Sequence, residues 1–439
     1  MDVLLVNPEN TRGNNPFRDD SKYEPVELEL IGGYLSAENI SWDIWDGQVE
    51  SEDFLQKLKR TEPSVVYIQG KVFQENYMLE YAACARELKA TVIIGGEYAG
   101  SYPERFFKSC VDIILISNNF MIIPAVVRKD GLSYQSAPGT LINLAPLTTS
   151  VCNVPESEWV INPGKPSDMT KLPLPDRRYF MANSDSYKIY DHRPCAVINT
   201  YTPFGKRKTA SEIASEIASV KVDSIYIDSD FLCDKKYIED FCNVMNDSGV
   251  LRRLVFNGNN RFCVEHPGSI KALYDIGLCK VITDFSVADD ISAKSVKGKK
   301  IKTQDEQAAE ILRAANVEIV GRFTLKLTDR QEDFKRVLRF VKRNKIRRFR
   351  LEIYQPQFTR DLFSSKNYSL NLVTTDPEAW DNVHITVNPT NMTVKEFYFN
   401  YYELMVKLII RTGLTGEFRF KDFKAAVTPL LSSIFGNAK

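Results

Sequence analysis

Histidine is scarce in this chain, and cysteine lacks the spacing that metal sites use. The 439 residues include three histidines, His192, His266 and His384, which lie far apart in the sequence. None of the eight cysteines stands in a CxxC pair, and most lie inside apolar runs, where a reduced cysteine behaves as a small hydrophobic residue. These absences argue against a histidine-rich zinc centre and a disulfide framework. We predict no metal site built by the chain alone, so any metal chemistry would come with a cofactor.

An excess of charge of one sign is also absent, as are long hydrophobic runs. Lys and Arg together number 57, as do Asp and Glu, so the formal net charge is +0. No overall basic field then attracts a phosphate backbone, which argues against a nucleic-acid binder. No apolar run reaches about 18 residues, the length that a membrane-spanning helix needs, and residues 1–8 are too short and too acidic for a signal peptide. We expect a cytoplasmic protein that binds neither nucleic acid nor membranes.

The chain does have the composition of a globular protein, with 44% hydrophobic and 26% charged residues. In its first part, short apolar segments alternate with amphipathic ones. Strands are expected over 3–6, 42–45, 64–68, 91–94 and 112–116, with helices near 27–38, 51–60, 74–88 and 102–108. Strands that are apolar on both faces and separated by helices indicate a parallel sheet covered on both sides. We therefore predict an α/β fold in which residues 1–128 form a doubly wound, flavodoxin-like domain with its ligand crevice at the carboxyl ends of the strands.

Proline and glycine punctuate residues 129–190, which we interpret as a connector on the surface. A second α/β run follows over residues 191–356. Its strands are expected over 196–200, 224–228, 254–257, 281–285, 318–325 and 349–354, with helices near 209–219, 234–247, 267–276, 304–315 and 330–344. Six such units are too few for the eight-fold barrel, so we predict a partial (βα)6 barrel with its site at the carboxyl ends of the strands. Residues 357–439 are predicted to form a mainly helical extension, with helices near 393–411 and 420–434.

Two barrel helices carry a capping-box signature at their start, Thr209 with Glu212 and Thr303 with Glu306. The basic stretch 335–350 could suggest a nucleic-acid patch. Its apolar residues recur at helical spacing, however, which favours a solvated outer helix of the barrel.

Several phrases, in this order, resemble the cobalamin-binding radical S-adenosylmethionine enzymes. They are VLLVNP at 3–8, PVELELIGGYL at 25–35, PSVVYIQG at 63–70, VIIGGEY at 92–98, LPLP at 172–175, YIDSDF at 226–231 and KGKKIKT at 297–303. The resemblance covers about residues 1 to 356. It implies a cobalamin-binding doubly wound domain followed by a partial barrel like a radical S-adenosylmethionine core.

The sequence departs from that family where the family's cluster loop belongs. In the family, a CxxxCxxC loop after the first barrel strand holds a [4Fe–4S] cluster whose open iron binds S-adenosylmethionine. Here residues 196–209 contain no cysteine, and Cys195 lies at the start of the strand. We therefore expect a degenerate member without a [4Fe–4S] cluster, in which S-adenosylmethionine binding stays open.

The cobalamin side of the resemblance is also altered. Glu27 stands where the family usually has a small glycine, Tyr98 stands where relatives often have histidine, and no DxHxxG motif is present. The glycine pair Gly95 and Gly96 remains, and it permits close approach of a large planar ligand or its nucleotide tail. The alternative is a domain retained for packing, in which the pair is only a tight turn. The residues that the resemblance implies for cobalamin are Pro8, Gln69, Gly70, Gly95, Gly96, Glu97, Tyr98, Ser117 and Asn118.

Polar residues at the ends of the barrel strands are the remaining candidates. We predict catalytic roles for Asp228, Asp230 and Tyr354, and substrate-binding roles for Asn199, Asn257, Asp284 and Arg322. Each has a structural alternative. Asp230 is also suited to helix capping, the Asn-Gly pair at 257–258 is a turn signal, and Arg322 has Asp284 or Glu352 as a structural partner.

Three hypotheses from different classes follow. The first is an enzyme of specialised metabolism that acts on a small molecule by polar chemistry without an adenosyl radical, such as cobalamin-linked methyl transfer. The second is an inactive accessory subunit that pairs with an active homologue, and the third is a small-molecule carrier or sensor. An enzyme should keep a roomy polar cavity at the barrel top, whereas an accessory subunit should fill that cavity and expose an apolar patch elsewhere.

Overall fold

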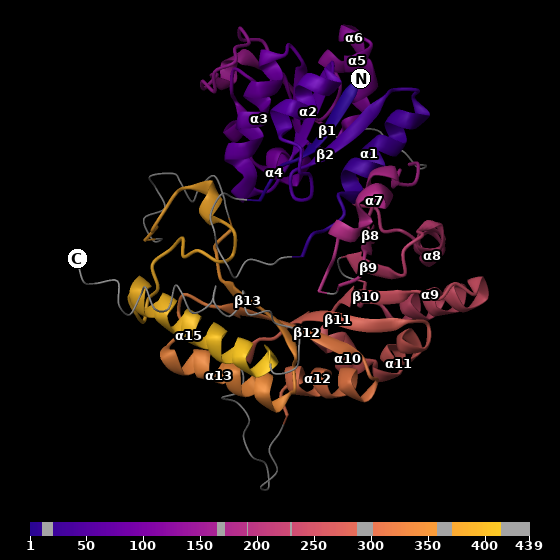
Figure 1. Cartoon of the computed structure of the whole chain (residues 1–439), viewed down its shortest axis with the longest axis vertical. Helices are drawn as coiled ribbons and strands as arrows, with labels where there is room; N and C mark the ends of the chain where they lie inside the picture. The colour runs from indigo at the N-terminus through magenta and orange to yellow at the C-terminus, as the bar shows by residue number, and fades with distance from the viewer. Residues whose placement is uncertain are drawn as a thin grey trace.

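Two sheets, one in each half of the chain, organise the structure (Figure 1). This computed structural model describes residues 1–10, 21–164, 172–190, 192–228, 231–287, 302–357 and 371–413. The first sheet has seven strands in the order β2-β1-β3-β4-β5-β6-β7, and the second has six in the order β13-β12-β11-β10-β9-β8. The predicted fold class, a doubly wound domain joined to a partial barrel, is confirmed.

The first sheet begins with five parallel strands close to the predicted positions. They are β1 (Val3–Asn7), β2 (Trp42–Asp46), β3 (Val65–Gln69), β4 (Thr91–Gly95) and β5 (Ile113–Leu115). The helical segments between them are α1 (Val26–Ala37), α2 (Phe54–Thr61), η1 (Val72–Gln74), α3 (Glu75–Glu87), α4 (Gly96–Ser101) and η2 (Pro103–Phe106). Both faces of the strands are buried under helices, which is why the strands are apolar throughout.

The stretch that the sequence assigned to a surface connector contributes two strands to this sheet, which corrects that assignment. After η3 (Phe120–Ile122), α5 (Ile123–Val127) and α6 (Gly131–Gln135), strands β6 (Thr140–Asn143) and β7 (Trp159–Asn162) pair antiparallel at the edge. Prolines at 138, 146, 155 and 163 flank these strands without interrupting them. Since proline is tolerated beside edge strands, the proline-rich composition concealed a hairpin.

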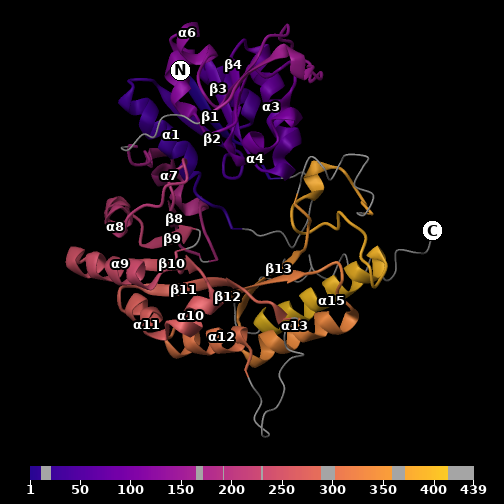
Figure 2. The same cartoon turned by 180° about the vertical axis from the view of Figure 1, so that it is seen from behind.

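The second sheet is a row of six parallel strands whose spatial order follows the sequence. They are β8 (Cys195–Asn199), β9 (Ser224–Asp228), β10 (Arg253–Asn257), β11 (Leu278–Asp284), β12 (Glu318–Leu325) and β13 (Arg348–Ile353). The helices are α8 (Ala210–Ser219), α9 (Lys235–Ser248), α10 (Asn260–Glu265), α11 (Pro267–Asp275), α12 (Gln304–Ala314) and α13 (Gln331–Arg343), and they cover one side of the sheet (Figures 1 and 2). Both predicted capping boxes are present, at the starts of α8 and α12.

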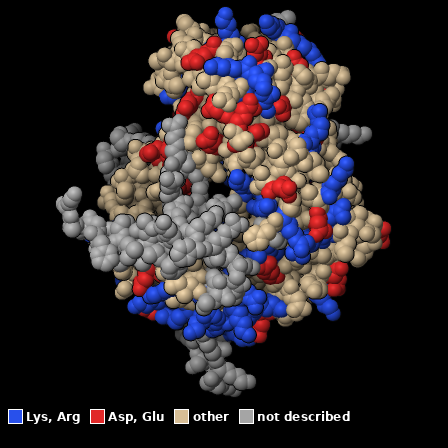
Figure 3. Space-filling model, in the orientation of Figure 1, with Lys and Arg blue, Asp and Glu red and all other residues tan. Residues whose placement is uncertain are grey.

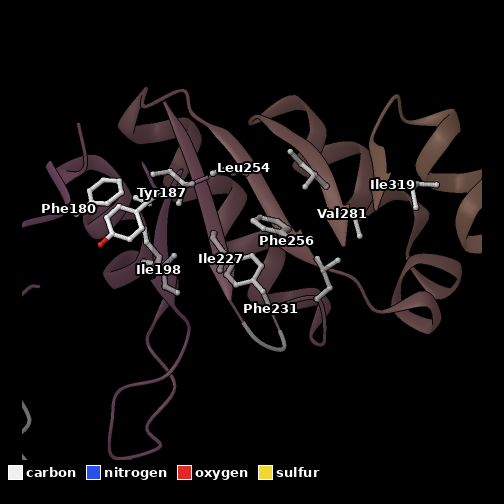
Figure 4. Close-up of a cluster of buried hydrophobic side chains, with 14 of the residues drawn as sticks. Phe180, Tyr187, Ile198, Ile227, Phe231, Leu254, Phe256, Val281 and Ile319 are labelled. Atoms are coloured by element: carbon white, nitrogen blue, oxygen red, sulfur yellow. The ribbon is translucent and has the colours of Figure 1, made fainter. Parts of the chain in front are cut away.

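Alternate residues of each barrel strand point to opposite sides. Ile198, Ile227 and Phe256 belong to the core under the helices, which Figure 4 shows. Their neighbours Val197, Tyr226 and Val255 form a separate buried cluster on the inner side of the sheet. Because side chains alternate with period two, the next residue on each inner row lies at the carboxyl end of its strand. These residues are Asn199, Asp228 and Asn257.

Buried polar contacts join the two halves. Arg177 pairs with Glu24 before α1 and donates to Glu216 on α8 at 2.8 Å, and all three side chains are less than a tenth exposed. Nearby, the backbone N–H of Phe180 on α7 (Arg178–Asn183) donates to Glu29 at 2.8 Å. Since buried charges are stable only when paired, these contacts fix how the first sheet sits over the barrel.

The C-terminal part packs along the outside of the barrel. Helix α15 (Val394–Gly413) buries Phe397 and Tyr401, and Phe397 contacts Phe334 of α13 edge to face. Helix α13 buries its apolar stripe, as the outer-helix interpretation of the basic stretch requires, and Lys and Arg gather at the lower edge in Figure 3. The helix expected near 420–434 lies outside the described residues. No helix within the described ranges has the length and apolar character needed to cross a membrane.

Candidate functional site

Two adjoining cavities lie where the carboxyl ends of both sheets meet. The first, of about 540 Å³, lies between the end of β3, the inner ends of the barrel strands and residues 381–383 of the C-terminal part. We call it the interdomain cavity. The second, of about 770 Å³, lies between connector residues 172–175 and the loop after β8, and we call it the loop cavity. Ligands of α/β proteins bind at the carboxyl ends of parallel strands, so this is the expected place for a site.

Five residues line both cavities, and we call them the junction. Val26, Glu27 and Glu97 come from the first domain, and Asn199 and Asp228 end the barrel strands β8 and β9. The register pairs Asn199 directly with Asp228. The junction therefore places three carboxyl groups and one amide, contributed by both domains, on the wall that the two cavities share.

Asp228 is oriented by neighbours on its own strand and the next. Its Oδ1 accepts from the Tyr226 hydroxyl at 3.1 Å and from Asn257 Nδ2 at 3.1 Å. Within the described residues, the Oδ1 of Asn257 is buried and accepts no hydrogen bond. Two donors on one carboxylate oxygen restrict the rotation of Asp228.

Glu27 lies in the first turn of α1 and faces both cavities, which is why its side chain is exposed although protein surrounds it on most sides. Gln69 Nε2 donates to its Oε2 at 3.3 Å. Burial between the domains raises the pKa of Glu27, and the negative charges of Glu97 and Asp228 raise it further, against the opposing effects of Gln69 and Lys71. The side chain of Glu97 makes no hydrogen bond or ion pair with any described residue.

The structure gathers many of the predicted residues at this site. Those lining the interdomain cavity are Gln69, Gly70, Gly96, Glu97, Asn199, Asp228, Asn257 and Arg322, and Asn118 lines the loop cavity. Arg322 also makes the structural pair named as its alternative, donating from Nε and Nη2 to the two oxygens of Asp284 at 2.8 Å each.

Other predicted residues lie away from both cavities. The Pro8 carbonyl accepts from Gln74 Nε2 at 2.7 Å, Tyr98 is buried against Glu75, and Tyr354 is half exposed. Ser117 packs beneath Gly139, and Asp284 points to Arg322. Asp230 lies outside the described residues.

Sequence reasoning missed Glu27 as a site residue. It noted Glu27 only as a departure from the family pattern. A carboxylate two residues after Pro25, in the first turn of the helix that follows β1, was the available signal, because this turn faces the carboxyl edge of the sheet.

The loop after β8 is a tight turn. Thr202 N–H donates to the Lys206 carbonyl at 2.8 Å, and Lys208 N–H donates to the Thr200 carbonyl at 2.9 Å. Lys208 also pairs with Glu216 at 2.6 Å, and Arg207 stacks over the Tyr237 ring. The loop thus presents basic side chains to the loop cavity, at the position where the resemblance implies the family's cysteine loop.

The cysteines themselves are dispersed. Cys195 and Cys263 are fully buried, and burial raises the pKa of Cys263 to about 12, which disfavours the thiolate that a metal needs. Among the described residues, no three His, Cys, Asp or Glu side chains are grouped so that they could hold a metal ion.

Comparison with known proteins finds similarity in structure. No family model matches the chain, and no curated protein matches its sequence. The cobalamin-dependent S-adenosylmethionine radical enzyme OxsB, solved with aqua-cobalamin and S-adenosylmethionine bound, is similar with a TM-score of 0.56 and 14% identity, over 81% of this chain and 54% of OxsB. The radical S-adenosylmethionine methyltransferase TsrM from Kitasatospora setae, solved with cobalamin and a [4Fe–4S] cluster, is similar with a TM-score of 0.53 and 14% identity, over 81% of this chain and 76% of TsrM. The chain thus spans about half the length of OxsB, and at this identity the likeness shows the fold.

Cobalamin is the group that this fold implies, and the described residues do not fit it at the predicted crevice. A Cβ added to Gly95 would lie 2.6 Å from Cε2 of Tyr67, and one added to Gly70 would lie 2.8 Å from Sδ of Met78. The space beside Gly95 is therefore filled by the chain's own Tyr67, whereas Gly70 also lines the interdomain cavity. Packing against Tyr67 explains Gly95 better than the cofactor interpretation does, and the tight-turn alternative describes Gly96, whose φ is +86.

Proposed function

We propose that this chain is a degenerate relative of the cobalamin-dependent radical S-adenosylmethionine enzymes that transfers a group between two small molecules by polar chemistry, without a [4Fe–4S] cluster. The observation that carries the proposal is the junction, whose residues from both domains line two adjoining cavities. Two cavities that share one polar wall suit two ligands that meet there.

The charges around the junction favour a cationic ligand. Most other acidic residues lining the cavities have basic partners: Glu216 with Arg177 and Lys208, and Glu352 with Arg350. Glu27 has only the neutral Gln69 as a hydrogen-bond partner among the described residues, and Glu97 has none there. Desolvation and the negative charges of Glu97 and Asp228 raise the pKa of Glu27, so a positive charge that approaches its carboxylate would be favourable. An amine or sulfonium would supply that charge, and S-adenosylmethionine carries both.

The chemistry that this arrangement supports is methyl transfer from a sulfonium to a nucleophile on the second ligand. The nucleophile's lone pair attacks the methyl carbon, the carbon–sulfur bond breaks, and its electron pair stays on sulfur as a neutral thioether. The proton released by the nucleophile passes to a junction carboxylate. Glu27 is suited to receive it, because the environment that raises its pKa makes its carboxylate a stronger base. The cobalamin-linked form of this reaction is not proposed, because Tyr67 fills the space beside Gly95 that a cobalamin or its nucleotide tail would approach.

The test compares a cationic and a neutral probe in calorimetric titrations. We expect S-adenosylmethionine to bind, and methylthioadenosine, which lacks both cations, to bind more weakly. Glu27→Gln and Glu97→Gln keep the shape of the side chains and remove the charge. Each should weaken S-adenosylmethionine about tenfold, roughly the value of one charge-assisted contact, and leave methylthioadenosine unchanged. Equal losses for both probes would contradict the role of charge.

Iron analysis after anaerobic reconstitution with iron and sulfide tests the proposal that the chain holds no [4Fe–4S] cluster. Little iron should remain after gel filtration, and a full [4Fe–4S] complement would refute it.

The accessory-subunit alternative is favoured by a different observation. Leu144, Val151 and Ile161, on and around the β6–β7 hairpin, are between 45% and 65% exposed, which is unusual for residues of this type at a sheet edge. If neither probe binds and the chain instead forms a complex with an active homologue on gel filtration, that alternative replaces the enzyme. Binding without turnover would indicate a carrier or sensor.

A further inference from the structure

We infer that Tyr67 closes the ligand crevice of the first domain, so that the domain excludes the nucleotide tail of cobalamin and serves as a wall of the interdomain cavity. This inference does not depend on the proposed function. It rests on the packing at the carboxyl ends of β3 and β4.

The register of these strands places Tyr67 and Gly95 on the same face. Tyr67 lies opposite Ile93, and Gln69 lies opposite Gly95. Since side chains two residues apart share a face, the Tyr67 ring has only to lean along its strand to cover Gly95. It does so: the ring is 2% exposed, and its edge takes the place that a side chain on Gly95 would need.

Gln69 completes the closure beside Tyr67. A Cβ on Gly96 would lie 3.1 Å from Cβ of Gln69, so Gln69 covers the second glycine of the pair. The backbone of Gly96 has φ +86, a conformation that favours glycine whatever the space around it. The pair is thus explained without a ligand: Gly95 makes room for a tyrosine, and Gly96 makes a turn.

Hydrogen bonds hold the two closing side chains in place. The Tyr67 hydroxyl donates to Gln69 Oε1 at 3.3 Å, and Gln69 Nε2 donates to Glu27 Oε2 at 3.3 Å. These two hydrogen bonds form a row of side chains, Tyr67, Gln69 and Glu27, that runs from the buried crevice to the junction. A ligand that entered the crevice would have to displace the ring and break the row that supports Glu27.

The consequence concerns the aromatic base at the end of the nucleotide tail. Ligands of open α/β sheets bind in the crevice outside the carboxyl ends of the strands, and Gly95 lies at such an end. Here an aromatic ring of the chain already occupies that space, and close-packed interiors leave no room for a second.

The test measures cobalt retained after incubation with hydroxocobalamin and gel filtration, together with the visible spectrum. Tyr67→Gly opens the crevice, and Tyr67→Phe keeps the ring and removes only the hydroxyl. We expect the wild-type chain and Tyr67→Phe to retain almost no cobalt, and Tyr67→Gly to retain at least about tenfold more, a factor that corresponds to about 1.4 kcal/mol.

Two results would overturn the inference. One is near-stoichiometric cobalt in the wild-type chain, and this measurement does not depend on the folding of any variant. The other is a Tyr67→Gly variant that keeps the wild-type far-ultraviolet circular dichroism and yet retains no more cobalt than wild type, because Tyr67 would then not be the group that excludes the tail.

Discussion

At the scale of single residues, the packing of Tyr67 against Gly95 makes a prediction about stability that involves no ligand. Gly95 has an extended φ of −144, so its backbone accepts any residue, and only the Tyr67 ring opposes a side chain. Gly95→Ala should lower the free energy of unfolding by about 1–3 kcal/mol, the usual cost of overpacking a core. Gly268→Ala is the control, since nothing lies within 4 Å of the new Cβ and the residue is in helix α11. It should be neutral or stabilising by about 0.5–1 kcal/mol in urea unfolding. Equal stabilities of the two variants would argue against a filled crevice.

Residue patterns predicted positions better than they predicted contacts. Asn199, Asp228 and Asn257 were identifiable because each follows an apolar strand, and the parallel sheet brings such positions together. The occupant of the space above Gly95 was not identifiable, because that depends on strand register and on the direction of one tyrosine ring. Glu27 was likewise visible only as an unusual residue, since its approach to Glu97 and Asp228 is produced by the packing of two domains.

At the scale of elements, the capping boxes allow a direct test of local sequence signals. Thr209 Oγ1 accepts from the Glu212 N–H at 3.2 Å, and Glu212 accepts from the Thr209 N–H at 2.6 Å. Thr209→Ala removes one acceptor from the start of α8 and should lower the free energy of unfolding by about 1 kcal/mol. Ser211→Ala, at an exposed position in the first turn of the same helix, should change it by less than about 0.5 kcal/mol. A loss no larger than that of the control would mean that tertiary contacts alone hold this helix end.

Helices and strands were predictable where the composition and the spacing of apolar residues indicate the same element. They were less predictable where prolines flank a short segment. The parallel strands match their expected ranges within a few residues, because buried strands are apolar and their flanking helices are amphipathic. Strands β6 and β7 were missed because four residues each, bracketed by prolines, give too short a pattern to outweigh the turn signals. The single helix expected near 102–108 is instead α4 followed by the short η2, because Pro103 begins a new segment after Tyr102.

At the scale of the whole molecule, the arrangement of the two domains decides whether the junction exists. Asp46, at the end of β2, is fully buried where the connector meets the first sheet. Its carboxylate accepts from the Tyr187 hydroxyl at 2.7 Å and from Asn7 Nδ2 at 2.9 Å, and Tyr187 in turn accepts from the first barrel strand at Cys195. No sequence pattern marked Asp46, because its burial arises only when the second half of the chain covers it. The contact therefore reports on the docking of the domains.

Asp46 makes the stability of this docking depend on pH in a definite direction. Burial raises its pKa from 3.8 to about 6, although hydrogen bonds from Gln48, Tyr187 and Asn7 oppose the shift. The folded state then binds this proton more tightly than the unfolded state does. The contribution of Asp46 to the free energy of unfolding is therefore largest below about pH 4, falls as the pH rises to about 6, and is constant above. The shift corresponds to at most about 3 kcal/mol.

Other carboxyl groups change in the opposite sense, so the comparison must be between variants. The pKa of Glu212, for example, is lowered by its hydrogen bonds with Thr209, and the stability that it contributes is lost as the pH falls. Asp46→Asn removes only the Asp46 contribution. In urea unfolding followed by tryptophan fluorescence, its stability relative to wild type should increase between pH 4 and pH 7 by on the order of 2 kcal/mol. Tyr187→Phe, which removes a donor to the carboxylate, should make the decline with pH steeper than in wild type. Parallel profiles for all three chains would show that Asp46 titrates alike in the folded and unfolded states, and hence that it is not enclosed between docked domains in solution.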